Sequence, residues 1–155
     1  MPAYDFVTVD VFTDQRFGGN PLAVFPRAEG LDTQTMQAIA AEFNLSETTF
    51  VFPSQDRRHD AHVRIFTPRT ELPFAGHPNV GTAFVLGRAT EPGRPTLSFE
   101  EHAGIVEARL SRGADGVVDG ARIAAPRPLS VGSRVSPAVV ARCVGLDEQI
   151  GRAHV

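Results

Sequence analysis

The alternation of apolar and polar side chains predicts strands in the first half of the chain. Val7, Val9 and Val11 fall on one face of residues 4–12 and aromatic residues on the other, so we expect a strand covered on both sides. Residues 61–66 alternate apolar positions with His62 and Arg64, which predicts a strand with one polar face. Two further strands are expected at 22–25 and 48–52, where β-branched and aromatic residues are concentrated.

Two segments are predicted to be helices. Met36, Ile39, Ala40 and Phe43 recur at helical spacing, which predicts a helix with one core-facing side. Asp32 stands where an N-cap is expected. The segment Val80–Leu86 is small or apolar on nearly every side, so we expect the second helix to be buried all round.

Three more strands are expected after the second helix, and they complete an α+β fold. They cover residues 96–100, 104–110 and 117–123 and look like antiparallel neighbours. Strands on both sides of one apolar helix predict a curled, mainly antiparallel sheet wrapped around a central helix. We assign this unit to residues 1–125.

The remaining residues are predicted to form a linker and the start of a second unit, at 126–149. Pro126 and Pro128 indicate the linker, and Ser136 followed by Pro137 predicts a helix over 137–144. We interpret the single cysteine, Cys143, as a small core residue of that helix. Residues 150–155 match the translation of a common sequencing-adapter sequence, and our hypothesis is that they are a non-native tail.

Composition narrows the classes of function. The net charge is −3, which does not favour binding to nucleic acid or to an anionic membrane. All 15 basic residues are arginine, so Schiff-base lysine chemistry is excluded within this chain. One cysteine allows no internal disulfide, and the N-terminus lacks the pattern of a signal peptide. We therefore expect a cytoplasmic protein.

The run Pro73–Gly81 (PFAGHPNVG) is the first candidate site. Gly76 allows close approach of a ligand to the backbone, and proline is favoured in the first turn of a helix. The free N–H groups of a helix start bind anions, and His77 can exchange a proton near neutral pH. The alternative reading is a plain turn into a core helix.

The second candidate is Glu47, within Asn44–Val51 (NLSETTFV). A carboxylate can remove a carbon-bound proton beside a π-system and return it elsewhere. Leu45 and Phe50 are expected to shield Glu47 from water. The alternatives are a solvated glutamate or the partner in a capping box. Ser46 can present its hydroxyl beside Glu47 or form a turn hydrogen bond.

Together with Val9–Phe25 and Arg64–Ala83, these motifs resemble the PhzF-like isomerase family of phenazine biosynthesis as far as about Leu110. The resemblance implies a two-lobed fold like that of diaminopimelate epimerase, with the second lobe truncated here. It implies that Glu47 is the proton shuttle of an allylic isomerisation, and that His77, Gly76 and Ser46 bind substrate. Asn20 and Pro21 match a family motif, which we interpret as pocket wall or turn architecture rather than chemistry. The second-lobe aspartate and Gly-Ser pair of the family have no counterpart here.

The predicted function is therefore a cofactor-free isomerase acting on a small carboxylated cyclic diene similar to trans-2,3-dihydro-3-hydroxyanthranilate. The resemblance allows a homodimer in the full-length form. His59 and His62 are not joined by the further ligands that a metal site requires, so no metal is expected. The alternative function is a catalytically incomplete lobe that binds a small acid or another chain.

Overall fold

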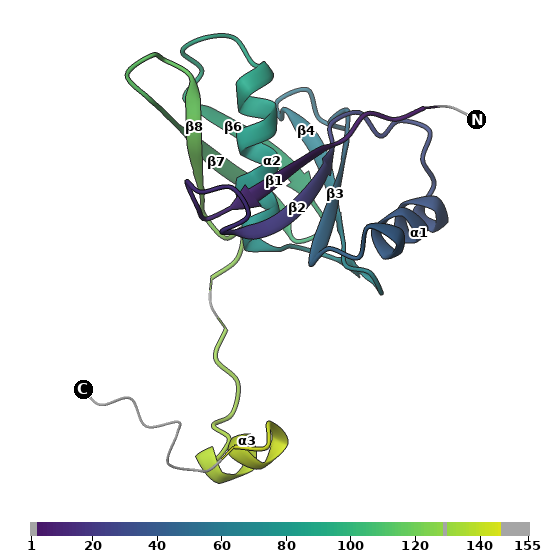
Figure 1. The fold of residues 1–155 in the computed structure, drawn as a ribbon, viewed down its shortest axis with the longest axis vertical. Coiled ribbons are helices and arrows are strands. Elements are labelled where there is room, and N and C mark those ends of the chain that lie inside the picture. The colour runs from purple at the N-terminus through teal and green to yellow at the C-terminus, as the bar shows by residue number, and fades with distance from the viewer. Residues whose placement is uncertain (1–2, 129, 147–155) are drawn as a thin grey trace.

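A computed structural model describes residues 3–128 and 130–146, and it contains one curled sheet with a helix inside it (Figure 1). The strands are β1 (Val7–Val11), β2 (Asn20–Phe25), β3 (Glu47–Phe52), β4 (Ala61–Phe66), β5 (Glu71–Leu72), β6 (Thr96–Glu101), β7 (Gly104–Arg112) and β8 (Val118–Ile123). The helices are α1 (Thr33–Phe43), α2 (Gly76–Ala89) and α3 (Pro137–Cys143). The hypothesis of a non-native tail at 150–155 falls outside the described residues.

The strand order is β1-β2-β3-β4-β6-β7-β8, with β5 paired to β4. Pairing is antiparallel except between β2 and β3 and between β4 and β6, which are parallel. The expected α+β class, with a curled and mainly antiparallel sheet around a central helix, is confirmed.

Two apolar clusters lie on opposite faces of the sheet because neighbouring residues of a strand point to opposite sides. On β3, Val51 joins the inner cluster with α2, whereas Phe50 joins the outer cluster with α1. Phe50 stacks on Phe25 and meets Phe66 edge-on, with ring centroids 4.9 and 5.5 Å apart. The two clusters make β3 a rigid support for the residue at its start, Glu47.

The predicted first helix is confirmed together with its cap. The Asp32 carboxylate accepts a hydrogen bond from the Thr35 N–H at 2.7 Å, and Met36 and Ala40 are fully buried. Asn44 ends the helix in the left-handed conformation, with φ of 51°. This sharp turn brings the chain directly into β3.

The prediction that the central helix is buried all round is wrong. Val80 and Phe84 are only half-buried, although Thr82 and Ala83 have no exposed surface. The cause is the open sheet, since β1 and β8 are its two edges and do not pair with each other. A cavity of about 480 Å³ lies between these edges and is lined by Val80, Gly81 and Phe84.

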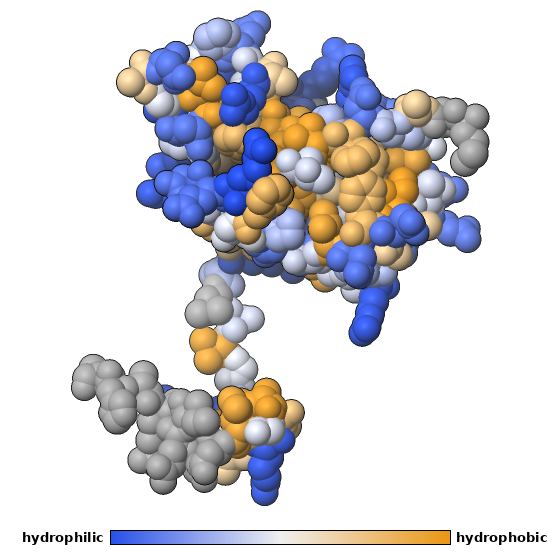
Figure 2. Space-filling view, in the orientation of Figure 1, coloured by the Kyte–Doolittle hydropathy of each residue, from blue (hydrophilic) through white to orange (hydrophobic). Residues whose placement is uncertain are grey.

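The prediction that the strand at the start of the chain is covered on both sides is wrong. β1 is an edge strand in which Val11 is buried but Val7 is 42% exposed, and the flanking Phe12 is 75% exposed. Alternation of apolar residues does not reveal that a strand has only one neighbour. Figure 2 shows apolar surface gathered over the region where β1 and β2 lie in Figure 1.

The third helix begins at Pro137 with Ser136 at the N-cap position, as predicted, although the serine side chain makes no capping hydrogen bond. No residue of α3 is buried. Cys143 is exposed, so its interpretation as a core residue is wrong. Figure 1 shows α3 lying apart from the sheet, and no other helix or strand of the described residues lies over it. Within the described residues, every helix is too short or too polar to span a bilayer.

Candidate active site

The start of α2 and the start of β3 bring the two candidate acid/base groups together. Glu47 begins β3, where it lies opposite Leu22 of the parallel strand β2. His77 is the second residue of α2. The distance between His77 Nε2 and Glu47 Oε2 is 3.3 Å, and the two side chains are 9% and 17% exposed. Both atoms are buried, and apart from this contact neither has a hydrogen-bond partner among the described residues.

A third residue, Asn20, orients the imidazole. Asn20 begins β2, and its amide nitrogen lies 3.2 Å from His77 Nδ1. The Ser46 hydroxyl donates a hydrogen bond to Asn20 Oδ1 at 2.9 Å, which leaves the amide N–H groups to face the ring. Asn20 therefore donates to Nδ1, and in a neutral imidazole the proton is then on Nε2, facing Glu47.

His77 is held in its neutral form near pH 7. Burial lowers the pKa of His77 below its ordinary value of 6.5, while the charge of Glu47 and the Pro21 carbonyl act in the opposite direction. Desolvation disfavours the charged imidazolium, and this effect is the largest of the three. The ring is thus available as a neutral hydrogen-bond donor through Nε2.

One buried hydrogen bond connects the two elements that carry this pair. The hydroxyls of Thr49 on β3 and Thr82 on α2 lie 2.9 Å apart, and both side chains are fully buried. Thr49 is two residues beyond Glu47 on the same strand. The bond fixes the position of α2 along β3, and with it the separation of Glu47 and His77.

Gly76 leaves open space where the helix begins. A Cβ atom built on Gly76 would meet nothing within 4 Å, whereas one on Gly81 would lie 2.6 Å from Leu22 Cδ2. Gly81 is therefore needed for packing of α2 against β2. Gly76 has no such packing role. Its N–H belongs to the group of helix-start donors that lack an intrahelical partner.

The structure thus brings Glu47, His77 and Ser46 into one cluster, with Gly76 at its side. Asn20, which we interpret as pocket wall or turn architecture, lies in the same cluster, because its side chain bonds directly to His77 and Ser46. The available signal for Asn20 was its place in Val9–Phe25, one of the segments that carry the family resemblance. The catalytic and binding roles of all these residues stay predictions.

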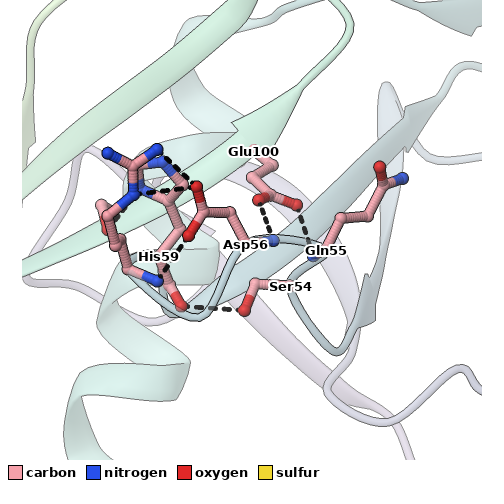
Figure 3. A network of polar contacts seen from close by, with 7 residues as sticks. Ser54, Gln55, Asp56, His59 and Glu100 are labelled. Carbon is pink, nitrogen blue, oxygen red and sulfur yellow. Dashed lines mark hydrogen bonds and ion pairs between the residues drawn. The ribbon is translucent and has the colours of Figure 1, made fainter.

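A separate polar network closes the loop between β3 and β4 (Figure 3). The Glu100 carboxylate accepts hydrogen bonds from the N–H groups of Gln55 and Asp56 at 2.7 and 2.8 Å. Ser54 donates to the carbonyl of His59 at 2.8 Å, and Asp56 binds the Arg58 guanidinium. All of these hydrogen bonds join groups of the loop to one another or to β6, so we interpret the network as structural.

The chain is similar to known proteins both in sequence and in structure. The family model described as phenazine biosynthesis-like protein matches residues 9–136. An uncharacterized isomerase of Mesorhizobium japonicum is 44% identical over 94% of this chain and 48% of its own length. A trans-2,3-dihydro-3-hydroxyanthranilate isomerase of Pseudomonas aeruginosa is 46% identical over 79% of this chain and 43% of its own length. The chain thus spans about half the length of these curated relatives.

Solved structures agree with the sequence matches. A phenazine biosynthesis protein of the PhzF family from Bacillus anthracis has a TM-score of 0.67 and 32% identity, over 76% of this chain and 39% of that one. A hydroxyproline epimerase from Agrobacterium vitis has a TM-score of 0.59 at 17% identity, over 76% of this chain and 40% of that one, which shows a shared fold only.

Proposed function

Since this chain belongs to the family of phenazine biosynthesis-like proteins, we propose that it supplies the acid/base half of an isomerase site. The reaction moves a proton on a small carboxylated cyclic diene of the trans-2,3-dihydro-3-hydroxyanthranilate type, and it needs no cofactor. That compound is named for three relatives that are 45–46% identical to this chain. The second half of the site belongs to a further lobe of a longer protein.

The observation that carries this proposal is the Glu47–His77 pair. A carboxylate and a neutral imidazole 3.3 Å apart, both mostly buried, can take and return a proton without leaving the site. Burial also excludes the water that would otherwise screen the charges that develop during proton transfer.

The proposed reaction requires neither an oxidant nor a second substrate, because a proton only moves from one carbon atom of the substrate to another. The Glu47 carboxylate removes a proton from a saturated carbon next to the diene, so one C–H bond breaks and the electron pair moves into the π-system. The same carboxyl group then returns the proton to the far end of the allylic unit, where a new C–H bond forms. His77 donates a hydrogen bond through Nε2 to the Glu47 carboxylate and stays neutral.

The substrate carboxylate is proposed to bind at the start of α2. The N–H groups of a first helical turn and the positive end of the helix dipole favour an anion there. Gly76 is exposed and leaves room for this approach. The Ser46 hydroxyl donates to Asn20 Oδ1, at the other end of the amide that faces His77, and so helps to fix the Asn20 side chain.

The direct test is an assay of the full-length form with trans-2,3-dihydro-3-hydroxyanthranilate, followed by proton NMR in D₂O. We expect loss of the original allylic proton signal and appearance of the isomerised diene. Binding of the compound without any conversion would contradict the isomerase proposal.

A second candidate function is favoured by the length of the chain relative to its relatives. Because it spans 48% and 43% of two of them, the chain by itself is a candidate lobe that binds a small acid or another chain without catalysis. Calorimetric binding of a dihydroanthranilate to the 155 residues, with no turnover in either the short or the full-length form, would favour this reading.

Gly76→Val tests the proposed anion site. We expect it to raise KM several-fold while changing the melting temperature little, because a Cβ at Gly76 meets no protein atom within 4 Å. Gly132→Val is the matched control, since that position is also open. An unchanged KM in Gly76→Val would place the substrate carboxylate elsewhere.

A further inference from the structure

The two oxygens of the Glu47 carboxylate have different surroundings. Oε2 is buried, and apart from His77 Nε2 at 3.3 Å it has no hydrogen-bond partner among the described residues. The buried side-chain oxygens without a partner include Oε2 but not Oε1, and no hydrogen bond reaches Oε1 from the described part of the chain. Oε1 is therefore the oxygen with exposed surface, in a side chain that is 17% exposed overall.

The contact between Glu47 Oε2 and His77 Nε2 indicates where the proton of the imidazole lies. A carboxylate oxygen can only accept a hydrogen bond, whereas a ring nitrogen donates or accepts according to the tautomer. If Nε2 had no proton, two buried acceptors would face each other without a donor, which costs free energy. A proton on Nε2 satisfies both atoms at once.

Asn20 completes the same pattern at the other ring nitrogen. When the proton of a neutral imidazole is on Nε2, Nδ1 is an acceptor and needs a donor. Asn20 Nδ2 lies 3.2 Å from His77 Nδ1, while Asn20 Oδ1 accepts a hydrogen bond from the Ser46 hydroxyl at 2.9 Å. Burial lowers the pKa of His77 and so favours the neutral ring. The Pro21 carbonyl competes with this arrangement, because it favours an added proton on the ring and acts to raise the same pKa.

We propose that Asn20 is a positioning residue that holds the proton of His77 on Nε2, so that the ring occupies Glu47 Oε2 and Oε1 is the oxygen that exchanges a proton with the substrate. The inference deepens the isomerase function proposed above and rests on it. In the first step a C–H bond of the substrate breaks, an O–H bond forms at Oε1, and the electron pair moves into the π-system. In the second step that O–H bond breaks and a new C–H bond forms at the far end of the allylic unit. Oε2 keeps its hydrogen bond from Nε2 throughout.

Asn20→Asp tests the positioning role because it replaces the amide N–H groups by a carboxylate of the same shape. A carboxylate beside Nδ1 draws a proton to that atom, since the hydrogen bond at one ring nitrogen decides the state of the other. Nε2 then either loses its proton and faces Oε2 as a second acceptor, or keeps it in a charged imidazolium. Nδ1 is protonated in both cases. Asn44→Asp is the matched control, because it makes the same chemical change at an exposed residue that caps α1 through its backbone N–H.

The first readout is the nitrogen-15 NMR spectrum of the His77 ring, recorded without substrate on the full-length form near neutral pH. In the wild type and in Asn44→Asp, we expect Nε2 to have the shift of a protonated ring nitrogen and Nδ1 that of an unprotonated one. In Asn20→Asp, Nδ1 should take the shift of a protonated nitrogen. We expect kcat of Asn20→Asp to fall by roughly tenfold or more, which is less than the loss of a general acid/base group. Its melting temperature should stay close to that of the wild type.

The second readout is a crystal structure of the full-length form with bound anthranilate, which has the carboxylate of the proposed substrate but no allylic hydrogen. We expect the anthranilate ring carbon nearest to Glu47 to lie closer to Oε1 than to Oε2, with the contact between Oε2 and His77 intact. A ring carbon that lies closer to Oε2, with His77 displaced, overturns the assignment of Oε1.

The wild-type spectrum decides the tautomer even if Asn20→Asp does not fold. A wild-type ring that is protonated on Nδ1, or an Nδ1 that stays unprotonated in Asn20→Asp, overturns the positioning role of Asn20. An unchanged kcat in Asn20→Asp overturns it as well. These outcomes are separate from the isomerase assay, because turnover by a wild type with its ring proton on Nδ1 would contradict this inference and leave the isomerase function standing.

Discussion

Glu47→Gln is expected to lower turnover by roughly a hundredfold or more in the full-length form, which is the usual contribution of a general acid/base. Glutamine has the same size but cannot take or return a proton. Its amide can still lie beside His77 Nε2, at the position where the carboxylate is 3.3 Å away. The fold should therefore be retained.

The measurement is kcat by steady-state assay, with circular dichroism and melting temperature recorded on the same samples. Glu42→Gln is the control, because Glu42 is an exposed carboxylate on α1 that is remote from the first turn of α2. Wild-type turnover in purified Glu47→Gln would show that Glu47 is not the proton shuttle. A loss of turnover together with a much lower melting temperature would instead show that Glu47 stabilises the β2–β3 junction.

The second large effect concerns the 155-residue chain by itself. We expect no measurable turnover from it, and full activity only when the segment corresponding to the other half of its relatives is present. Glu47 and His77 are on one wall of the proposed site, and α3, the helix that follows β8 in the described part of the chain, has no buried residue. A substrate bound there would face water on its other side, where proton transfer to carbon is slow.

This expectation is checked by comparing the short and extended forms in the same NMR assay at equal concentration. Adding the second lobe as a separate chain is an informative third sample, because recovery of activity would show that the two lobes assemble without a covalent link. Turnover by the 155 residues alone would show that the first lobe contains a complete site, and the proposed division of the site would then be wrong.

The sequence by itself determined the local structure and the main chemical groups. Apolar periodicity and composition located α1 and the described strands other than β5, because side-chain direction repeats every 3.6 residues in a helix and every second residue in a strand. The Asp32 cap followed from its position before an apolar helical period, and the structure confirms it. Glu47 and His77 could be named because they lie in motifs that resemble those of a known family, and such motifs are recognisable without coordinates.

Only the tertiary structure decided which residues meet. Asn20 bonds to His77 across 57 positions of sequence, and Thr49 bonds to Thr82 across 33. The exposure of β1 and of one side of α2 depends on where the sheet ends, and the exposure of Cys143 depends on the position of α3 apart from the sheet. The burial of the Glu101 carboxylate is a further case, since a glutamate at a strand end looks solvated in the sequence. These properties arise from burial and long-range contact, and the periodicity of a single segment contains no information about either.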